Sequence, residues 1–220
     1  MTITKELQDA CGNGDTKNVK FLLRTSLIDP SDNNNYAIRL ASKNGDTKLV
    51  KLLLNDPRVD PSAINNLAIQ WASKKGHTDV VKLLLNDPRV NPSDDNNFAI
   101  QWASDKGHAE VVKLLLQAPC CLNGSRVDPS ANNNYAIQLA SQRGHTEVVR
   151  LLLNDPRVNP SDKDNYVIRQ TKSMVIINML LEKVHLPTDV DIKKYKKFLI
   201  KKKYLLKLLS TKVYDYSKLF

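Results

Sequence analysis

The chain of 220 residues has few of the residue types that mark secreted and membrane proteins. It holds three cysteines, of which Cys120 and Cys121 are adjacent, so we expect no disulfide framework and place the protein in a reducing intracellular compartment, the cytoplasm. No run approaches the roughly 18 apolar residues that span a bilayer, and the N-terminus lacks an apolar signal core. We therefore expect a soluble, unsecreted protein, and we expect it to be a monomer.

The sequence also lacks the patterns that accompany catalysis and metal binding. We find no nucleophile with a base, no glycine-rich phosphate loop and no CxxC set. His77, His108 and His145 each follow a glycine, but equivalent positions on stacked helices lie about 8 to 10 Å apart, whereas metal ligand bonds are about 2 Å long. We predict no enzyme activity, no cofactor and no metal site, and we assign the histidines to hydrogen bonds that hold turns.

Internal repetition is what the chain has in abundance. Glycines recur with steps of 31, 31, 31 and 37 residues, the last being one period plus six, at Gly14, Gly45, Gly76, Gly107 and Gly144. Prolines keep the same rhythm at Pro30, Pro61, Pro92, Pro129 and Pro160. A period of this length indicates small structural units that stack on one another.

The unit from Tyr36 to Ser62 predicts two short helices and a loop. Asn35 is placed to cap the first helix, and Gly45 to end it. Thr47 begins a second helix, which the Asp56-Pro57 pair stops because proline cannot continue a helical turn. Apolar residues mark the buried faces at Ala37, Ile38, Leu40 and Ala41 in the first helix and Leu49, Val50, Leu53 and Leu54 in the second. Two such helices cannot hide these faces alone, so neighbouring units must share a core.

Three segments closely resemble the ankyrin repeat: GHTDVVKLLL from Gly76, GHAEVVKLLL from Gly107 and GHTEVVRLLL from Gly144. The resemblance covers residues 4–187. It departs from the family pattern in having YAIRLA from Tyr36 in place of T-P-L-H-x-A, and a period of 31 residues instead of about 33. The asparagine-rich phrases, such as DPRVDPS from Asp56, also resemble repeats encoded by large amoeba-infecting DNA viruses, which would place the protein in a host cytoplasm.

The resemblance implies an all-α, right-handed solenoid of about six helix-turn-helix units joined by short loops or hairpins. The predicted units are 4–34, 35–65, 66–96, 97–133, 134–164 and 165–187, followed by a basic C-terminal helix or tail at 188–220. The first unit has the polar Lys5 and Asp9 where later units have aromatic or large apolar residues. We therefore expect it to act as a cap with an exposed outer side.

By the same resemblance, the ends of the first helices and the loop tips line a concave groove that contacts partner proteins. The basic residues just before the turn glycines would form a ridge there: Lys43, Lys74, Lys75, Lys106 and Arg143. The tips add variable residues, Asp32, Asp94 and Asp95 among them. Trp71 and Trp102 replace leucines of other units, and we assign them to the core. These features predict a non-catalytic protein-interaction module or adaptor; the alternative is that exposed positions simply drift.

Six extra residues lie in the segment QAPCCLNGSRVDPS, from Gln117 to Ser130. Its Cys120, Cys121 and Leu122 would give a protruding loop an apolar contact for a partner. A tolerated loop insertion explains the segment equally well.

The C-terminal segment concentrates the positive charge of the chain. Residues 186–220 hold ten lysines and three aspartates, a net charge of +7 out of +10 for the whole chain. The segment from Asp191 to Leu209 predicts an amphipathic helix whose basic side carries Lys193, Lys194, Lys196, Lys197, Lys201, Lys203 and Lys207. This helix could close the last unit, or it could bind nucleic acid or an anionic membrane. The start of the tail, Leu186 to Val190, also resembles F-box-like tails that dock ubiquitin-ligase subunits.

Overall fold

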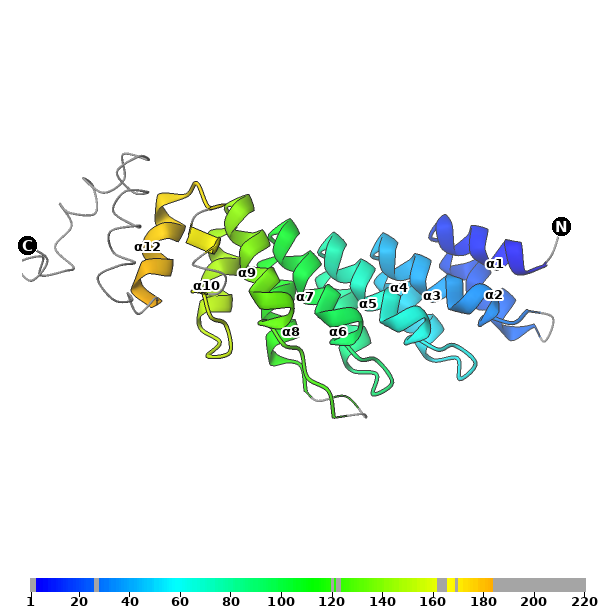
Figure 1. Cartoon of the computed structure of the whole chain (residues 1–220). Helices are drawn as coiled ribbons and strands as arrows, with labels where there is room; N and C mark the ends of the chain where they lie inside the picture. Colours follow the sequence, from blue (N-terminus) through cyan, green and yellow to red (C-terminus); the bar gives the residue numbers. More distant parts are fainter. Residues whose placement is uncertain are drawn as a thin grey trace, which may run out of the picture.

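The computed structural model shows a row of helix pairs stacked side by side (Figure 1). It describes residues 3–25, 28–119, 121, 124–161, 166–168 and 170–183. The helices are α1 (Ile3–Gly12), α2 (Thr16–Arg24), α3 (Asp32–Asn44), α4 (Thr47–Leu54), α5 (Ala63–Lys75), α6 (Thr78–Leu85), α7 (Asp94–Lys106), α8 (Ala109–Gln117), α9 (Ala131–Arg143), α10 (Thr146–Leu153) and α12 (Met174–Lys183). The described residues include no strand, so the predicted all-α solenoid is confirmed, and its units are joined by loops. None of these helices is long and apolar enough to cross a membrane.

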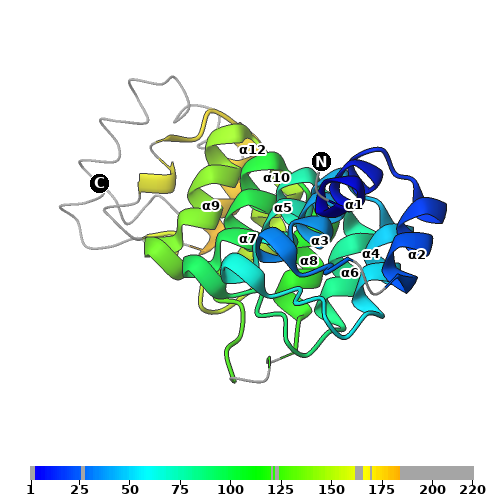
Figure 2. The same ribbon diagram turned by 90° about the vertical axis from the view of Figure 1, so that its right-hand side faces the viewer.

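The helices α1 to α10 form two layers, one of odd-numbered and one of even-numbered helices (Figures 1 and 2). Neighbouring odd-numbered helices share more extensive contacts than neighbouring even-numbered ones, and they are also the longer helices. The odd-numbered helices bury small residues such as Ala37 and Ala41, and small side chains at a contact allow helix axes to approach. The odd-numbered layer is therefore the more extensively packed of the two.

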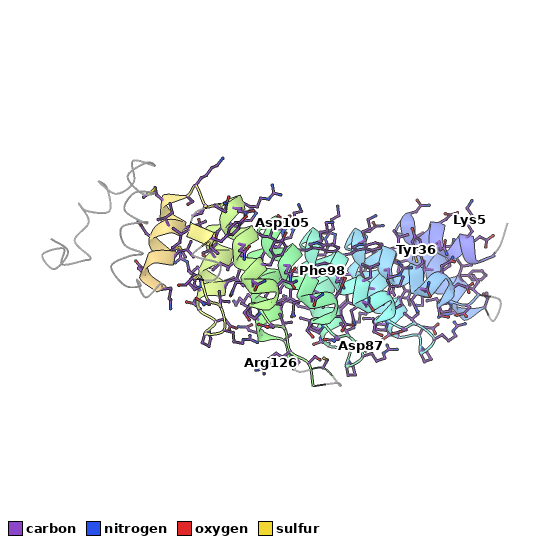
Figure 3. The ribbon with its side chains drawn as sticks, in the orientation of Figure 1. Lys5, Tyr36, Asp87, Phe98, Asp105 and Arg126 are labelled. Atoms are coloured by element: carbon purple, nitrogen blue, oxygen red, sulfur yellow. The ribbon has the colours of Figure 1, made fainter. Side chains whose placement is uncertain are left out.

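The core runs between the two layers without a break. In the second unit Ile38, Ala41, Leu49, Val50 and Leu53 are fully buried, and the same positions are buried in the units that follow. The predicted apolar faces of both helices are therefore confirmed, except that Leu40 and Leu54 are only half-buried at the edge of the core. At the N-terminal end Lys5 and Asp9 are exposed, as expected of a capping unit (Figure 3).

Each of the helices α3, α5, α7 and α9 begins with a turn of left-handed backbone. In α3 the residues Asn33, Asn34 and Asn35 have φ of 54°, 55° and 58°. Asparagine tolerates this conformation better than other residues with a side chain. A side chain one turn into the helix closes the turn: in α5 the Gln70 Nε2 donates to the Asn65 carbonyl at 2.6 Å. The clusters of asparagine in the sequence are therefore a backbone requirement.

The last asparagine of each left-handed turn holds the loop at the end of its own unit. Asn35 accepts a hydrogen bond on Oδ1 from the Asp60 backbone N–H at 2.7 Å, 25 residues later in the chain. The predicted role of Asn35 as a helix cap is wrong, because its left-handed φ and the direction of its side chain belong to this loop contact. Equivalent bonds run from Asn91 to Asn66, from Asp128 to Asn97 and from Asn159 to Asn134.

The turn glycines and the histidines interlock between consecutive units. Gly76 ends α5 with φ of 78°, and a Cβ placed there would lie 2.6 Å from the His108 ring of the next unit. The His108 Nε2 lies 3.1 Å from the Lys74 carbonyl. A carbonyl only accepts, so Nε2 carries the proton, and burial lowers the pKa of His108, which favours this neutral form. The histidines thus make turn hydrogen bonds, as predicted, but across the boundary between units.

The repeated DPR phrase ties each loop to the unit before it. Arg89 Nη2 pairs with Asp87 Oδ2 at 2.7 Å, while its Nη1 donates to the Val59 carbonyl at 2.8 Å. Arg58 and Arg157 repeat both contacts. In the fourth unit Ala118 stands in place of the aspartate, and within the described part of the chain Arg126 forms no such pair. We call the Asp–Arg pairs the loop braces.

The loop braces predict a loss of stability in acid. Hydrogen bonds donated by the arginines lower the pKa of Asp56, Asp87 and Asp155 in the folded chain. A folded-state pKa below the unfolded value of about 3.9 gives stability that is present above that pH and is lost as the pH falls through the folded pKa. We expect the urea concentration at the midpoint of unfolding to fall as the pH is lowered from about 5 to about 3. Urea denaturation at intervals of about 0.5 pH unit measures this. The variant with Asp56→Asn, Asp87→Asn and Asp155→Asn should have a flatter profile, and an equal slope in both proteins would contradict the assignment.

Candidate partner-binding face

The odd-numbered helices carry a stripe of half-buried apolar side chains, most of them aromatic, which we call the inner face. It is formed by the sides of α3, α5, α7 and α9 that do not enter the core, and it carries Tyr36, Leu67, Trp71, Phe98 and Trp102. The assignment of Trp71 and Trp102 to the core is wrong, because both are half-buried and the core positions of their helices belong to alanine and isoleucine. Phe98 and Trp102 stack with ring centroids 5.6 Å apart, as their positions four residues apart on one helix allow.

Basic side chains lie over these rings. The Lys74 ammonium is 4.3 Å from the centroid of Trp102, and the Lys43 ammonium is 5.2 Å from that of Trp71. Arg39, which is buried, lies between the rings of Tyr36 and Trp71 at 5.4 Å and 5.9 Å. In each contact with Trp71 or Trp102, a basic residue of one unit covers a ring of the next. The lysines therefore have a preferred position on the inner face without losing their charge.

Two of the three remaining predicted basic positions, Lys106 and Arg143, share one carboxylate. Asp105 accepts from the Lys106 ammonium at 2.8 Å and from the Arg143 guanidinium at 3.1 Å (Figure 3). Burial by itself would raise the pKa of Asp105, but the bonds from Lys106 and Arg143 outweigh it and lower the pKa. In contrast, the described residues offer no acid that pairs with Lys43, Lys74 or Lys75. Unpaired positive charge is thus concentrated on α3 and α5.

Comparison with protein families agrees with this repeated geometry. A family model described as ankyrin repeats (3 copies) matches residues 7–94, 38–125, 69–164 and 100–189. Together these matches cover most of the chain. The chain belongs to the ankyrin repeat family. Ankyrin repeats are generally non-catalytic scaffolds that bind other proteins, so the chain is a protein-interaction module.

A solved ankyrin repeat domain is similar to this ankyrin chain. The crystal structure of a domain from Acinetobacter baumannii AYE is 23% identical, with a TM-score of 0.60, over 80% of this chain and 96% of that one. At this identity the likeness concerns the fold alone. A search of curated proteins gave no match.

The predicted tip residues have different surroundings in this ankyrin stack. Asp94 is half-buried and accepts from the Asn66 side-chain amide at 2.5 Å and from the Asn91 amide. It therefore holds a loop in place. Asp95 is exposed at the start of a left-handed turn, with φ of 53°, and Asp32 is exposed at the start of α3.

The inserted segment between the fourth and fifth ankyrin units leaves the stack unchanged. His108 contacts a carbonyl 34 residues earlier, whereas His145, beyond the insertion, contacts one 40 residues earlier, a difference equal to the six inserted residues. Cys121 is half-buried, and its Sγ donates to the Asn91 Oδ1 at 3.3 Å and to the Ser125 carbonyl at 3.1 Å. Cys120 and Leu122 lie outside the described residues, as do the seven lysines assigned to the basic helix and all of residues 188–220.

Within the described residues, no group of three His, Cys, Asp or Glu side chains could hold a metal ion. The lysines over the tryptophans and the sharing of Asp105 were not predicted from the sequence. The recurring tryptophan and lysine positions, 31 residues apart at Trp71 and Trp102 and at Lys43 and Lys74, were the pattern that could have indicated the first of these.

Proposed function

We propose that this ankyrin repeat protein is a non-catalytic adaptor that binds a partner protein along its inner face. The observation that supports this most directly is the ammonium of Lys74 over the ring of Trp102 at 4.3 Å. Aromatic rings are enriched in protein interfaces and supply large contact area at a small cost in conformational entropy. Here they lie on closely packed helices, which already hold them in place before a partner arrives.

The proposal predicts that charge reversal on the inner face removes the partners. The variant carrying Lys74→Glu, Lys75→Glu, Lys106→Glu and Arg143→Glu should recover few of the proteins that the wild type binds, because its inner face would repel an acidic surface. Affinity purification from the native cell with quantitative mass spectrometry measures this. A control variant carries Lys48→Glu, Lys51→Glu and Lys113→Glu, which change exposed residues of the even-numbered layer. Equal recovery from wild type and the first variant would contradict the proposal.

A second candidate function comes from the net charge of +7 in residues 186–220. Binding of nucleic acid or an anionic membrane by this tail would weaken steeply with salt and would be lost when residues 188–220 are deleted. Docking to a ubiquitin ligase would instead appear as co-purification of ligase core subunits. A monomeric state, a cytoplasmic location and a viral origin with a host-cytoplasm setting are likewise proposals, supported by the sequence patterns described above.

A further inference from the structure

The helix α5 combines an exposed apolar residue, Ile64, with two lysines, Lys74 and Lys75, that pair with no acid in the described part of the chain. We propose that the partner docks on α5 through an acidic protein segment, which places an apolar side chain against Ile64 and Trp71 and carboxylates against Lys74 and Lys75. This inference rests on the proposed function and names the chemistry of the partner. Two independent observations support it: the backbone of Ile64 and the distribution of unpaired charge.

Ile64 occupies a position of the left-handed turn that is asparagine or aspartate in the other units. The first position of this turn is Asn33, Asp95 and Asn132 in the other units, but in α5 it is Ile64, with φ of 54° and a side chain that is 46% exposed. A β-branched residue in the left-handed region is strained, and here its apolar side chain does not enter the core. Strain that the chain itself does not compensate points to a role outside the chain, which an apolar contact with a partner would supply.

The charge on the inner face points to the same helix. Lys106 and Arg143 are partly neutralised by Asp105. Lys74 and Lys75 end α5 without an acidic partner among the described residues. Within the same part of the chain Lys43 at the end of α3 is unpaired as well, but α5 ends in two such lysines. An acidic segment therefore meets more uncompensated positive charge at the end of α5 than at the end of α3 or α7, and binding there should weaken with ionic strength.

The spacing on α5 fixes the size of the segment. Leu67, Trp71 and Lys74 follow one another at helical intervals of four and three residues, so they lie on one side of the helix. From Leu67 to Lys75 the helix rises about 12 Å, a length that about four extended residues cover. An apolar anchor and a carboxylate separated by about three residues would match the two ends of α5.

The test uses peptides selected on the purified full chain. A display library of random segments of about 12 residues, able to span roughly 40 Å, is selected for binding, and the recovered peptides are synthesised and titrated. We expect peptides with net negative charge and a large apolar residue near the acidic ones. Their affinity should fall about tenfold with Ile64→Asn and more with Lys74→Glu and Lys75→Glu together, while Ile64→Val and the pair Lys48→Glu and Lys51→Glu leave it within about twofold.

A stability measurement separates a docking role from a structural one. Ile64→Asn removes the strained β-branched residue, so it should raise the midpoint of thermal unfolding by about 2 to 4 °C while weakening peptide binding. A fall in the midpoint would overturn the inference. The inference is also overturned if the selected peptides are basic or neutral, or if they bind the Ile64→Asn and lysine variants as tightly as the unchanged protein. Either result is still compatible with a protein partner that binds elsewhere on the inner face. Recovery of no peptide at all, beside tight binding of RNA or anionic vesicles, overturns both this inference and the proposed function.

Discussion

Replacing Gly76 with alanine is expected to lower the free energy of unfolding by about 3 kcal/mol, a large effect for one methyl group. Gly76 has φ of 78°, where a residue with a side chain is strained. The new Cβ would lie 2.6 Å from the His108 ring, so the ring must move away. In moving, it loses the hydrogen bond to the Lys74 carbonyl, 3.1 Å long in the native turn. Urea denaturation followed by circular dichroism measures the loss.

The chain supplies a matched control at Gly144. Its φ is 80°, but among the described residues, apart from its own chain neighbours, none has an atom within 4 Å of a Cβ placed there. Gly144→Ala should therefore cost only the backbone strain, about 1 kcal/mol. Adding His108→Asp to Gly76→Ala should recover part of the loss, because Asp46 occupies the equivalent position in the second unit and caps its own helix by accepting from the Leu49 N–H at 3.0 Å. Equal costs at Gly76 and Gly144 would show that the histidine contact is unimportant.

Replacing Asn66 with alanine is expected to cost about as much, roughly 3 kcal/mol, through a different mechanism. The buried Asn66 side chain accepts from the Asn91 backbone N–H at 2.8 Å and donates to Asp94 Oδ2 at 2.5 Å. Alanine would leave a buried N–H without a partner, which costs more than the hydrogen bond itself. It would also place a residue less tolerant than asparagine at φ of 61°.

The neighbouring Asn65 isolates the part that side-chain bonding plays. Asn65 has φ of 52° but is exposed, so Asn65→Ala should cost only about 1 kcal/mol. Its carbonyl still accepts from Gln70 in that variant, because the backbone is unchanged. The difference between the two variants, measured by urea denaturation, reports on the contacts of Asn66 with the loop. If both variants lost the same stability, the loop contact would be worth little.

The helices and the core could be predicted because their causes are local and periodic. Gly45 ends α3 through its backbone conformation, Thr47 begins α4 directly after the Asp46 cap, and the Asp56-Pro57 pair follows the end of α4. These effects act within a few residues. The apolar intervals around Ile38 and Leu53 fixed which faces are buried. Such signals do not depend on knowing which units touch.

The features that were not predicted depend on contacts between units, or on a left-handed backbone conformation that the residue type allows but does not require. Asn35 fits both a helix cap and a left-handed turn, and only the position of Asp60, 25 residues later, decides between them. Trp71 was assigned to the core because it replaces the leucine of other units, yet Lys43 of the previous unit covers its ring on the outside. The five basic residues of the predicted ridge differ in how far their charge is neutralised. Asp105, one residue before Lys106, pairs with Arg143 in the next unit.

The bonds from histidine, arginine and asparagine reach no farther than the adjoining unit. The His108 bond spans 34 residues, the Arg89 bond 30 and the Asn66 bond 25, close to the 31-residue spacing of the glycines. A gene duplication that copied one period would therefore also copy the donor and the acceptor residues of these hydrogen bonds. The protein can lengthen or shorten during evolution by whole units, with no substitution required to repair the seam.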